Sequence, residues 1–445
     1  MSHRLRTFDV TMLVVSLVIG IGIFRTPQIV AVQSGSLQVF AAAWVLGALC
    51  SLCGALTFAR IGMYHPVSGG FYSIFSACYH PGFAFALNWS LVVTNAASMA
   101  GVALIGAEYL APVIITPPVT QSHIHVIVTG IILSLYLVNI GGLRWGTTTQ
   151  NALSMLKVVL ILALCSLVFV LPAHSQDSTV VSDATSVGSS WYAALGTALI
   201  SVFFTYGGYQ STINIGADID KPERTFTKGI IGAMIIVLFL YGCANLAYVN
   251  VLGFETMKKS PLVASALASA LFGENGMRVT AVIIVISVIG FLNSGLICLP
   301  QTMTAMAEDG MLPSYFSRSA NGEKVSHRTL TVFTVLMLLQ YFGMGTFQRL
   351  LNYVMFTDSL SLAFGAACIY VFMKKSGNSS STATTPKARI FQILLPAIFI
   401  FIMLVVTVNV TISEPDNALA GLAVFIVGAC VYLLRRRLII KGIKV

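Results

Sequence analysis

Long apolar runs recur along this chain, and each has the length that an α-helix needs to cross a lipid bilayer. A membrane span takes about 20 mainly apolar residues. Its backbone must satisfy its own hydrogen bonds, so only helices and closed barrels can cross. The runs are continuous rather than alternating in polarity, which favours helices. Only 9% of the 445 residues are charged, against about 25% in soluble domains, and we therefore predict an all-α integral membrane protein.

The hydropathy of the chain predicts about 12 transmembrane helices. A shorter apolar segment, residues 261–273, is expected to form a helix that lies at the membrane surface. The predicted spans cover residues 8–33, 39–61, 83–113, 125–143, 151–171, 191–216, 229–251, 279–306, 330–345, 350–373, 390–410 and 418–434.

The basic residues are distributed unevenly between the two sides of this arrangement. With the N-terminus inside, 19 of the 25 Lys and Arg residues fall in inner segments, 4 in outer segments and 2 within spans. This bias agrees with the positive-inside rule and predicts that both termini are cytoplasmic. Membrane topology thus explains the net charge of +10, so lipid is the expected contact and nucleic acid is not. For a bacterial source, the predicted location is the inner (plasma) membrane.

The titratable and nucleophilic residues form no pattern that is typical of an enzyme. The eight Cys residues lie mostly inside apolar runs, with no spacing that indicates a disulfide framework or a metal site. The chain contains no intramembrane HExxH, Ser/His/Asp set or pair of catalytic carboxylates. We therefore expect no enzymatic activity, no metal and no cofactor. Because no outer loop offers a Cys for a disulfide to a companion subunit, no obligatory protein partner is expected.

Two of the predicted spans are interrupted by paired glycines. The first span reads IGIGIF at 19–24 and the sixth reads FFTYGGY at 203–209. Glycine weakens a helix, and unwound backbone at membrane depth is tolerated where it lines a cavity. Broken helices at corresponding positions of two repeats are the sequence signal of a transporter binding site. The alternative is that these glycines only allow close helix packing.

Several short motifs in order along the chain carry a resemblance to a known family. GIGIF at 20–24 is similar to GSGIF, and FTYGGYQ at 204–210 is similar to FAYGGWN. The stretch from Ala59 to Tyr72 resembles the AELG…PxSGGxY pattern, residues 220–224 follow as an NPxR turn does, and residues 307–313 resemble REGHLP. On these motifs the chain resembles the amino acid–polyamine–organocation transporter superfamily, nearest its L-type branch.

The resemblance implies a LeuT-type fold with a 5+5 inverted repeat, in which helices 1 and 6 are broken. The ten-helix core would then comprise residues 1–373, with repeats at about 8–171 and 191–373. Residues 374–389 contain a polar run and are expected to form a cytoplasmic linker. Residues 390–445 would add two peripheral helices and a basic tail.

The resemblance also implies how a substrate would bind. Backbone N–H groups of Gly20, Ile21 and Gly22 would bind the α-carboxylate, as half-helix N-termini suit anions. Carbonyl groups near Ile19 and at 204–206 would bind the α-amine, and Phe204 would cap the substrate. The candidate substrate-binding residues are Ile19, Gly20, Ile21, Gly22, Phe204, Thr205, Tyr206, Gly207, Gly208, Tyr209 and Gln210.

Lys157 is a charged residue within the fifth predicted span. Charged residues inside spans usually face the bundle interior and are functional, although a Lys about two turns from the inner end can also snorkel to the surface. By resemblance, Lys157 matches a lysine whose ammonium takes the place of sodium in sodium-independent members. We predict no coupling to sodium, and the sequence allows either exchange or proton symport, with Lys157 as the candidate ion-coupling residue.

Two further charges suggest an external gate. Arg25 follows the first glycine pair, and Asp358 lies in the tenth predicted span. In the LeuT fold these helices approach each other, so we expect Arg25 and Asp358 to pair when the gate closes, with Phe204 below them. Alternatively, Asp358 contacts substrate or carries a proton. Glu108, near the outer end of the third span, is expected to be a carboxylate at the membrane interface rather than a site residue.

Four departures from the family pattern stand out. Ile21 replaces a Ser, Arg60 a Glu, Tyr209 a Trp and Gln301 an Arg of the L-type branch. Because backbone groups would bind the α-carboxylate and the α-amine, these changes would leave recognition of an α-amino acid intact. They would affect the side-chain pocket and the inner gate. We predict a sodium-independent secondary transporter of small neutral amino acids that works by alternating access. The alternatives are a polyamine or cationic amino acid transporter of the same fold, or a membrane receptor or channel.

Overall fold

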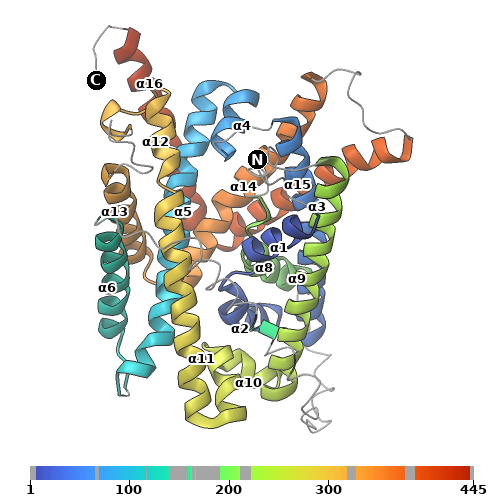
Figure 1. Ribbon diagram of the computed structural model, residues 1–445, viewed down its shortest axis with the longest axis vertical. Helices are drawn as coiled ribbons and strands as arrows, with labels where there is room; N and C mark the ends of the chain where they lie inside the picture. The colour runs from blue at the N-terminus through green and yellow to red at the C-terminus, as the bar shows by residue number, and fades with distance from the viewer. Residues whose placement is uncertain are drawn as a thin grey trace.

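The protein is a bundle of long α-helices, as its computed structural model shows (Figure 1). The structure describes residues 7–65, 70–116, 118–140, 191–210, 222–317, 327–375 and 386–440, and a few positions between 159 and 166. This part of the chain contains no β-strand. Its helices are α1 (Thr7–Val18), α2 (Gly22–Ser34), α3 (Leu37–Tyr64), α4 (Gly70–Cys78), α5 (Pro81–Ile114), α6 (Gln121–Ile140), α8 (Trp191–Tyr206), α9 (Pro222–Leu252), α10 (Phe254–Lys259), α11 (Val263–Cys298), α12 (Gln301–Glu308), α13 (His327–Met344), α14 (Phe347–Lys375), α15 (Pro386–Ser413) and α16 (Pro415–Ile440), with the 3₁₀ turn Ser314–Phe316.

The predicted all-α multi-pass architecture is confirmed. Among the described residues, eight helices are long and apolar enough to cross a membrane: α3, α5, α6, α9, α11 continued by α12, α14, α15 and α16. The first predicted span is the pair α1 and α2, the sixth is α8, and the ninth is α13. The fifth, at 151–171, lies largely outside the described residues, as does Lys157.

The surface helix expected at residues 261–273 is the first arm of α11. The helix begins at Val263 and kinks at Gly273, whose φ of 65° and ψ of −161° are not helical. Figure 1 shows this arm and α10 lying across the lower end of the bundle. Residues 263–272 therefore form a helix of their own, which the break at Gly273 separates from the spanning segment that follows.

Helix α5 lies at the centre of the bundle. In its most apolar stretch 89% of the residues are buried, compared with 22% in α16. Small residues allow neighbouring helices to approach α5 closely: a Cβ on Gly101 would lie 3.5 Å from the ring of Phe347, and one on Gly106 would lie 2.7 Å from Val288. The outer end of α5 is thereby placed beside the start of α14. The division into two inverted repeats, the linker and the peripheral C-terminal helices remains a prediction.

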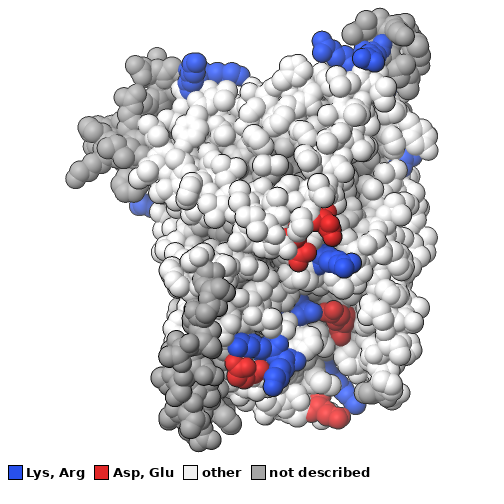
Figure 2. All heavy atoms as spheres, turned by 180° about the vertical axis from the view of Figure 1, so that it is seen from behind, with Lys and Arg blue, Asp and Glu red and all other residues white. Residues whose placement is uncertain are grey.

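Charged side chains are confined to parts of the surface. Figure 2 shows a broad uncharged band on one face, with Lys and Arg at the upper edge and charges of both signs in the lower half. A membrane protein needs an uncharged surface of this kind where lipid tails cover it. The upper end is also where α4, α12 and the end of α16 lie, whereas α2 and α10 lie toward the lower end (Figure 1).

Candidate functional site

The first transmembrane segment is interrupted at the position that the glycines predict. Helix α1 ends at Val18 and α2 begins at Gly22, so Ile19, Gly20 and Ile21 connect the two half-helices. The N-cap residue Ile21 provides no side-chain acceptor for the first N–H groups of α2, as far as the described chain shows. Such a helix N-terminus carries partial positive charge and suits an anionic group.

The helix of the sixth predicted span ends at the second glycine pair. Helix α8 runs to Tyr206, and Gly207 and Gly208 form the turn that follows. Gly208 has a φ of 113°, a backbone conformation that favours glycine, and its N–H donates to Oε1 of Gln210 at 2.8 Å. Residues 204–206, whose carbonyl groups were expected to bind the amine, form the last turn of α8. Their carbonyl groups lie at the negative C-terminal end of the helix.

The two interruptions lie against each other. A Cβ on Gly22 would lie 3.1 Å from the Cα atom of Thr205. The hydroxyls of Thr26 and Thr205 are 2.5 Å apart in a buried contact, and each also lies within 2.9 Å of a carbonyl of its own helix. The positive start of α2 thus adjoins the negative end of α8, which suits the carboxylate and ammonium of one amino acid.

Buried tyrosines from neighbouring helices fix the backbone around the first break. The Tyr241 hydroxyl of α9 donates to the Val18 carbonyl at 3.0 Å and lies 3.4 Å from the Thr205 carbonyl. Tyr109 of α5 donates to the Phe24 carbonyl at 2.7 Å. Neither tyrosine was predicted from the sequence to be a site residue. The sequence does contain a signal for them, because a tyrosine buried in an apolar span usually needs a hydrogen-bond partner for its hydroxyl.

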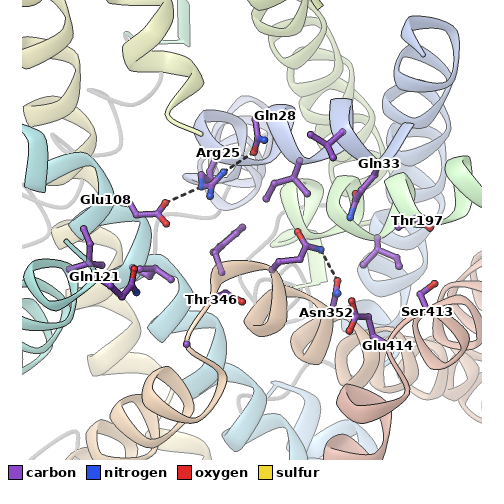
Figure 3. A pocket seen from close by; sticks show the side chains of 18 residues that line it. Arg25, Gln28, Gln33, Glu108, Gln121, Thr197, Thr346, Asn352, Ser413 and Glu414 are labelled. Carbon is purple, nitrogen blue, oxygen red and sulfur yellow. Dashed lines mark hydrogen bonds and ion pairs between the residues drawn. The ribbon is translucent and has the colours of Figure 1, made fainter. Parts of the chain in front are cut away.

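A layer of aromatic and charged side chains lies next to the breaks. The rings of Phe204 and Phe347 meet edge to face with centroids 5.9 Å apart. Arg25 lies over Phe347 at 5.7 Å from the ring centroid. Its Nε donates to Oε2 of Glu108 at 3.0 Å, and its Nη1 donates to Oε1 of Gln28 at 2.9 Å (Figure 3).

In this conformation the partner of Arg25 is Glu108 and not Asp358. Arg25 faces the first residue of α14, Phe347, whereas Asp358 is 11 residues further along, which is roughly 16 Å along a helix axis. Glu108, which was expected to be an interface carboxylate outside the site, is the residue that forms the ion pair. The expected pairing of Arg25 with Asp358 is therefore wrong for this conformation.

Asp358 lies deeper in the bundle than the ion pair of Arg25 and Glu108. It shares a face of α14 with Gly365, seven residues later, whose added Cβ would lie 3.1 Å from the ring of Phe58. Asp358 is only partly accessible, and it lies within electrostatic reach of Tyr209. Its role as a substrate contact or a proton carrier remains a prediction. Lys157 lies outside the described residues.

An open cavity of about 570 Å³ lies against this layer of aromatic and charged side chains. Arg25, Glu108 and Phe347 form part of its lining, and other parts come from α6, α8 and the connection between α15 and α16. Figure 3 shows the ion pair on one side of the cavity and Glu414 on the opposite side. The cavity lies toward the lower end of the bundle in Figure 1, beside α2.

A multi-pass helical bundle whose first span is broken in midmembrane, with the break facing the end of a second interrupted helix, has the architecture of a membrane transporter. The chain belongs to the amino acid permease family, which it matches over residues 5–433. This assignment confirms the resemblance on which the sequence analysis relied. The family consists of transporters rather than enzymes.

Relatives of known function extend the similarity over nearly the whole chain. The chain is 26% identical over 420 residues to the serine/threonine exchanger SteT of Bacillus subtilis, covering 92% of each protein. It is 26% identical to the human large neutral amino acids transporter small subunit 2, covering 95% of this chain and 78% of that one. The human cystine/glutamate transporter is 24% identical, with 95% and 83% covered. These relatives do not favour the alternatives of a polyamine carrier, a receptor or a channel.

Proposed function

We propose that this protein is a sodium-independent transporter of small neutral amino acids that works by alternating access. The observation that carries this proposal is the contact between the N-terminus of α2 and the last turn of α8. This arrangement offers backbone N–H groups and carbonyl groups to the two charged ends of one amino acid. The residues at the two breaks, 19–22 and 204–210, are all uncharged, which favours a neutral substrate side chain.

The substrate binds between the two breaks in this proposal. The N–H groups of Gly20, Ile21 and Gly22 bind the α-carboxylate, and carbonyl groups of Ile19 and of the last turn of α8 bind the ammonium. Phe204 covers the substrate from the outer side, because its ring lies in the layer with Phe347. The remaining candidates, Thr205, Tyr206, Gly207, Gly208, Tyr209 and Gln210, shape the end of α8 and the turn that follows.

Lys157 replaces a coupling sodium ion in this proposal. With this lysine in that role, transport needs no added sodium. Both exchange and proton symport agree with such a lysine, since a desolvated Lys releases a proton more readily than one in water. Uptake assays decide between these two modes.

The external gate consists of Arg25 and Phe204, with Glu108 and Phe347 as their respective partners. The ion pair joins α2 to α5, and the aromatic pair joins α8 to α14. Opening this layer would connect the cavity above it to the substrate. Asp358 would then act below the gate, near Tyr209, as a substrate contact or a proton carrier.

The orientation and assembly follow from the charge bias and the relatives. Both termini are cytoplasmic, and the cavity opens to the outside of a bacterial inner membrane. One human relative is named a small subunit, whereas the bacterial relative, an exchanger, covers 92% of this chain with no subunit in its name. We therefore expect the purified chain alone to be active.

Uptake into proteoliposomes tests the proposal. The purified chain is reconstituted alone, without sodium, and offered a mixed set of labelled amino acids. Vesicles preloaded with unlabelled amino acids are compared with empty vesicles under an inward proton gradient. Uptake confined to preloaded vesicles identifies an exchanger, and uptake into empty vesicles that follows the gradient identifies a symporter. A strict need for sodium, or no uptake of any amino acid, would contradict the proposal.

A further inference from the structure

The outer cavity has the size and the lining of a binding site for a small molecule. Its volume of about 570 Å³ lies within the range of small-molecule sites, roughly 300–1,000 Å³. It is separated from the break in the first span by the layer that contains Arg25, Phe347 and Phe204. A molecule in the cavity would thus touch the outer side of the gate before it could reach the transport site.

Two of the three charged side chains that line the cavity, Arg25 and Glu108, are accessible but paired with each other, and the third is Glu414. The side chains of Arg25 and Glu108 are 12% and 26% exposed, and both line the cavity. Taking away one partner of such a largely buried pair leaves an uncompensated charge, which is costly. The pair therefore opens most easily when new partners for both charges arrive together.

Apart from Glu414 on the opposite side of the cavity, the remainder of the polar lining is uncharged. Side-chain amides of Gln28, Gln33, Gln121, Gln348 and Asn352 surround the ion pair and offer donors and acceptors alike. Gln348 donates to Asn352 at 3.0 Å on the wall opposite the pair (Figure 3). A lining of this kind can solvate a ligand that carries a carboxylate and an ammonium, without requiring a charged side chain.

We propose that this cavity is an outer binding site for zwitterionic amino acids, in which the ligand carboxylate replaces Glu108 on Arg25 and the ligand ammonium replaces Arg25 on Glu108. The inference rests on the proposed function and deepens it by assigning a separate site above the gate. A zwitterion compensates both charges at once. A ligand with only one of the two charges compensates one member of the pair and leaves the other unpaired.

When Arg25 and Glu108 each exchange the other for a group of the ligand, the gate would open. Arg25 joins α2 to α5 through Glu108, and Gln28, which accepts from Arg25, also donates to the Lys258 carbonyl of α10 at 2.8 Å. When the ligand replaces Glu108 on Arg25, the ionic link between α2 and α5 is lost, while the hydrogen bond from Tyr109 of α5 to the Phe24 carbonyl of α2 remains. The outer site thereby selects for zwitterions and couples their arrival to opening.

Binding measurements on a chain whose transport site is blocked test this inference. Gly20→Val fills the break, where only the Val18 carbonyl oxygen, 3.9 Å away, lies near an added Cβ among the described residues. Binding of tritiated L-serine and L-leucine is then measured in nanodiscs. We expect weak binding to remain in the Gly20→Val variant, at least tenfold weaker than in the wild type. This remaining binding should be lost when Arg25→Gln or Glu108→Gln is added.

The matched control is Arg278→Gln in the same background. Arg278 forms an exposed ion pair with Glu274 at 3.5 Å on α11, away from the cavity, so its loss should leave the residual binding unchanged. If Gly20→Val abolishes all binding, or if residual binding is insensitive to Arg25→Gln and Glu108→Gln, the outer site is overturned while the proposed function stands. If the wild-type chain binds neither amino acid, both are overturned.

A second measurement avoids the blocked variant, in case it does not fold. Uptake of L-serine by chains with an intact Gly20 is inhibited with L-serine methyl ester, which keeps only the positive charge, and with N-acetyl-L-serine, which keeps only the negative charge. Arg25→Gln leaves Glu108 unpaired and should increase the relative potency of the ester at least threefold. Glu108→Gln should do the same for the N-acetyl compound. Equal changes in the potency of both inhibitors would indicate that the Arg25–Glu108 pair only holds the helices together, and would overturn the inference.

Discussion

The two interruptions of the helices are fixed in different ways. At the break between α1 and α2, side chains from other helices hold the backbone, with Tyr241 on the Val18 carbonyl and Tyr109 on the Phe24 carbonyl. At the end of α8, the turn is made by its own residues, through the positive φ of Gly208 and the side chain of Gln210. Tertiary contacts therefore hold the backbone at the first break, whereas local sequence makes the turn at the second.

The glycines of the first break also differ from each other. An added Cβ on Gly22 would meet the backbone of Thr205 at 3.1 Å, whereas one on Gly20 would meet only the Val18 carbonyl oxygen at 3.9 Å. Gly22 allows two helices to pack closely, and Gly20 leaves space at the break. The two interpretations of these glycines, packing and substrate binding, thus apply to different residues of one motif.

Gly22→Val should have the largest effect, because the new side chain collides with the backbone of α8. We expect a cost of about 1–3 kcal/mol for overpacking, a lower midpoint in thermal unfolding and loss of most uptake. Gly130→Val on α6 is the control, since no described atom lies within 4 Å of its added Cβ. An unfolding midpoint equal to that of the wild type would show that Gly22 is not a packing residue.

Gly208→Ala tests whether the second break is determined locally. A φ of 113° is strained for any residue with a Cβ, and such conformations cost about 1–3 kcal/mol. We expect weaker substrate binding, because the turn after α8 relaxes to another geometry, and a modest loss of thermal stability. Gly343→Ala on α13, with open space around it in the described structure, provides the comparison. Unchanged binding would indicate that neighbouring helices hold this break too.

Gly20→Ala should separate binding from folding. The methyl group fits the space at the break, so the thermal midpoint should equal that of the wild type. It also occupies the position that we assign to the substrate carboxylate, and KM should rise about tenfold, which corresponds to about 1.4 kcal/mol. Uptake kinetics and thermal unfolding are measured on the same preparation. A normal KM would place the carboxylate elsewhere.

The contact between the two breaks should give the smallest effect. Thr26→Val, Thr205→Val and the double variant remove the hydroxyl pair that is 2.5 Å apart. Each remaining hydroxyl still has a helix carbonyl to bond to, so we expect a coupling energy of only about 0.5–1.5 kcal/mol. The double-mutant cycle is measured on the free energy or midpoint of unfolding. Strict additivity would mean that the hydroxyls do not link α2 to α8.

Hydropathy and glycine placement predicted the helical bundle and the breaks because both depend on local properties of the chain. A span of given length must satisfy its own backbone, and paired glycines in midspan weaken a helix wherever they occur. The end of α8 at Gly207 and Gly208 and the connection at residues 19–21 follow from these rules. The break at Gly273 is also local, and it separates the short helix expected at residues 261–273 from the span that follows.

The partners of buried polar groups could not be predicted from the sequence. Arg25 and Glu108 are 83 residues apart, and Tyr241 lies 223 residues from the carbonyl to which it donates. Such pairs depend on the rotation and depth of each helix in the bundle, which hydropathy does not specify. For the same reason Asp358, on the expected neighbouring helix, was assigned to the gate although it lies about three turns too deep.

A structure determined with an amino acid bound, in nanodiscs at a ligand concentration near KM, tests the central claim most directly. The account predicts density for the carboxylate beside the N–H groups of residues 20–22 and for the ammonium at the carbonyl end of α8, beneath Phe204. A ligand whose α-carboxylate and ammonium are held by charged side chains instead, with the break between α1 and α2 empty, would contradict it.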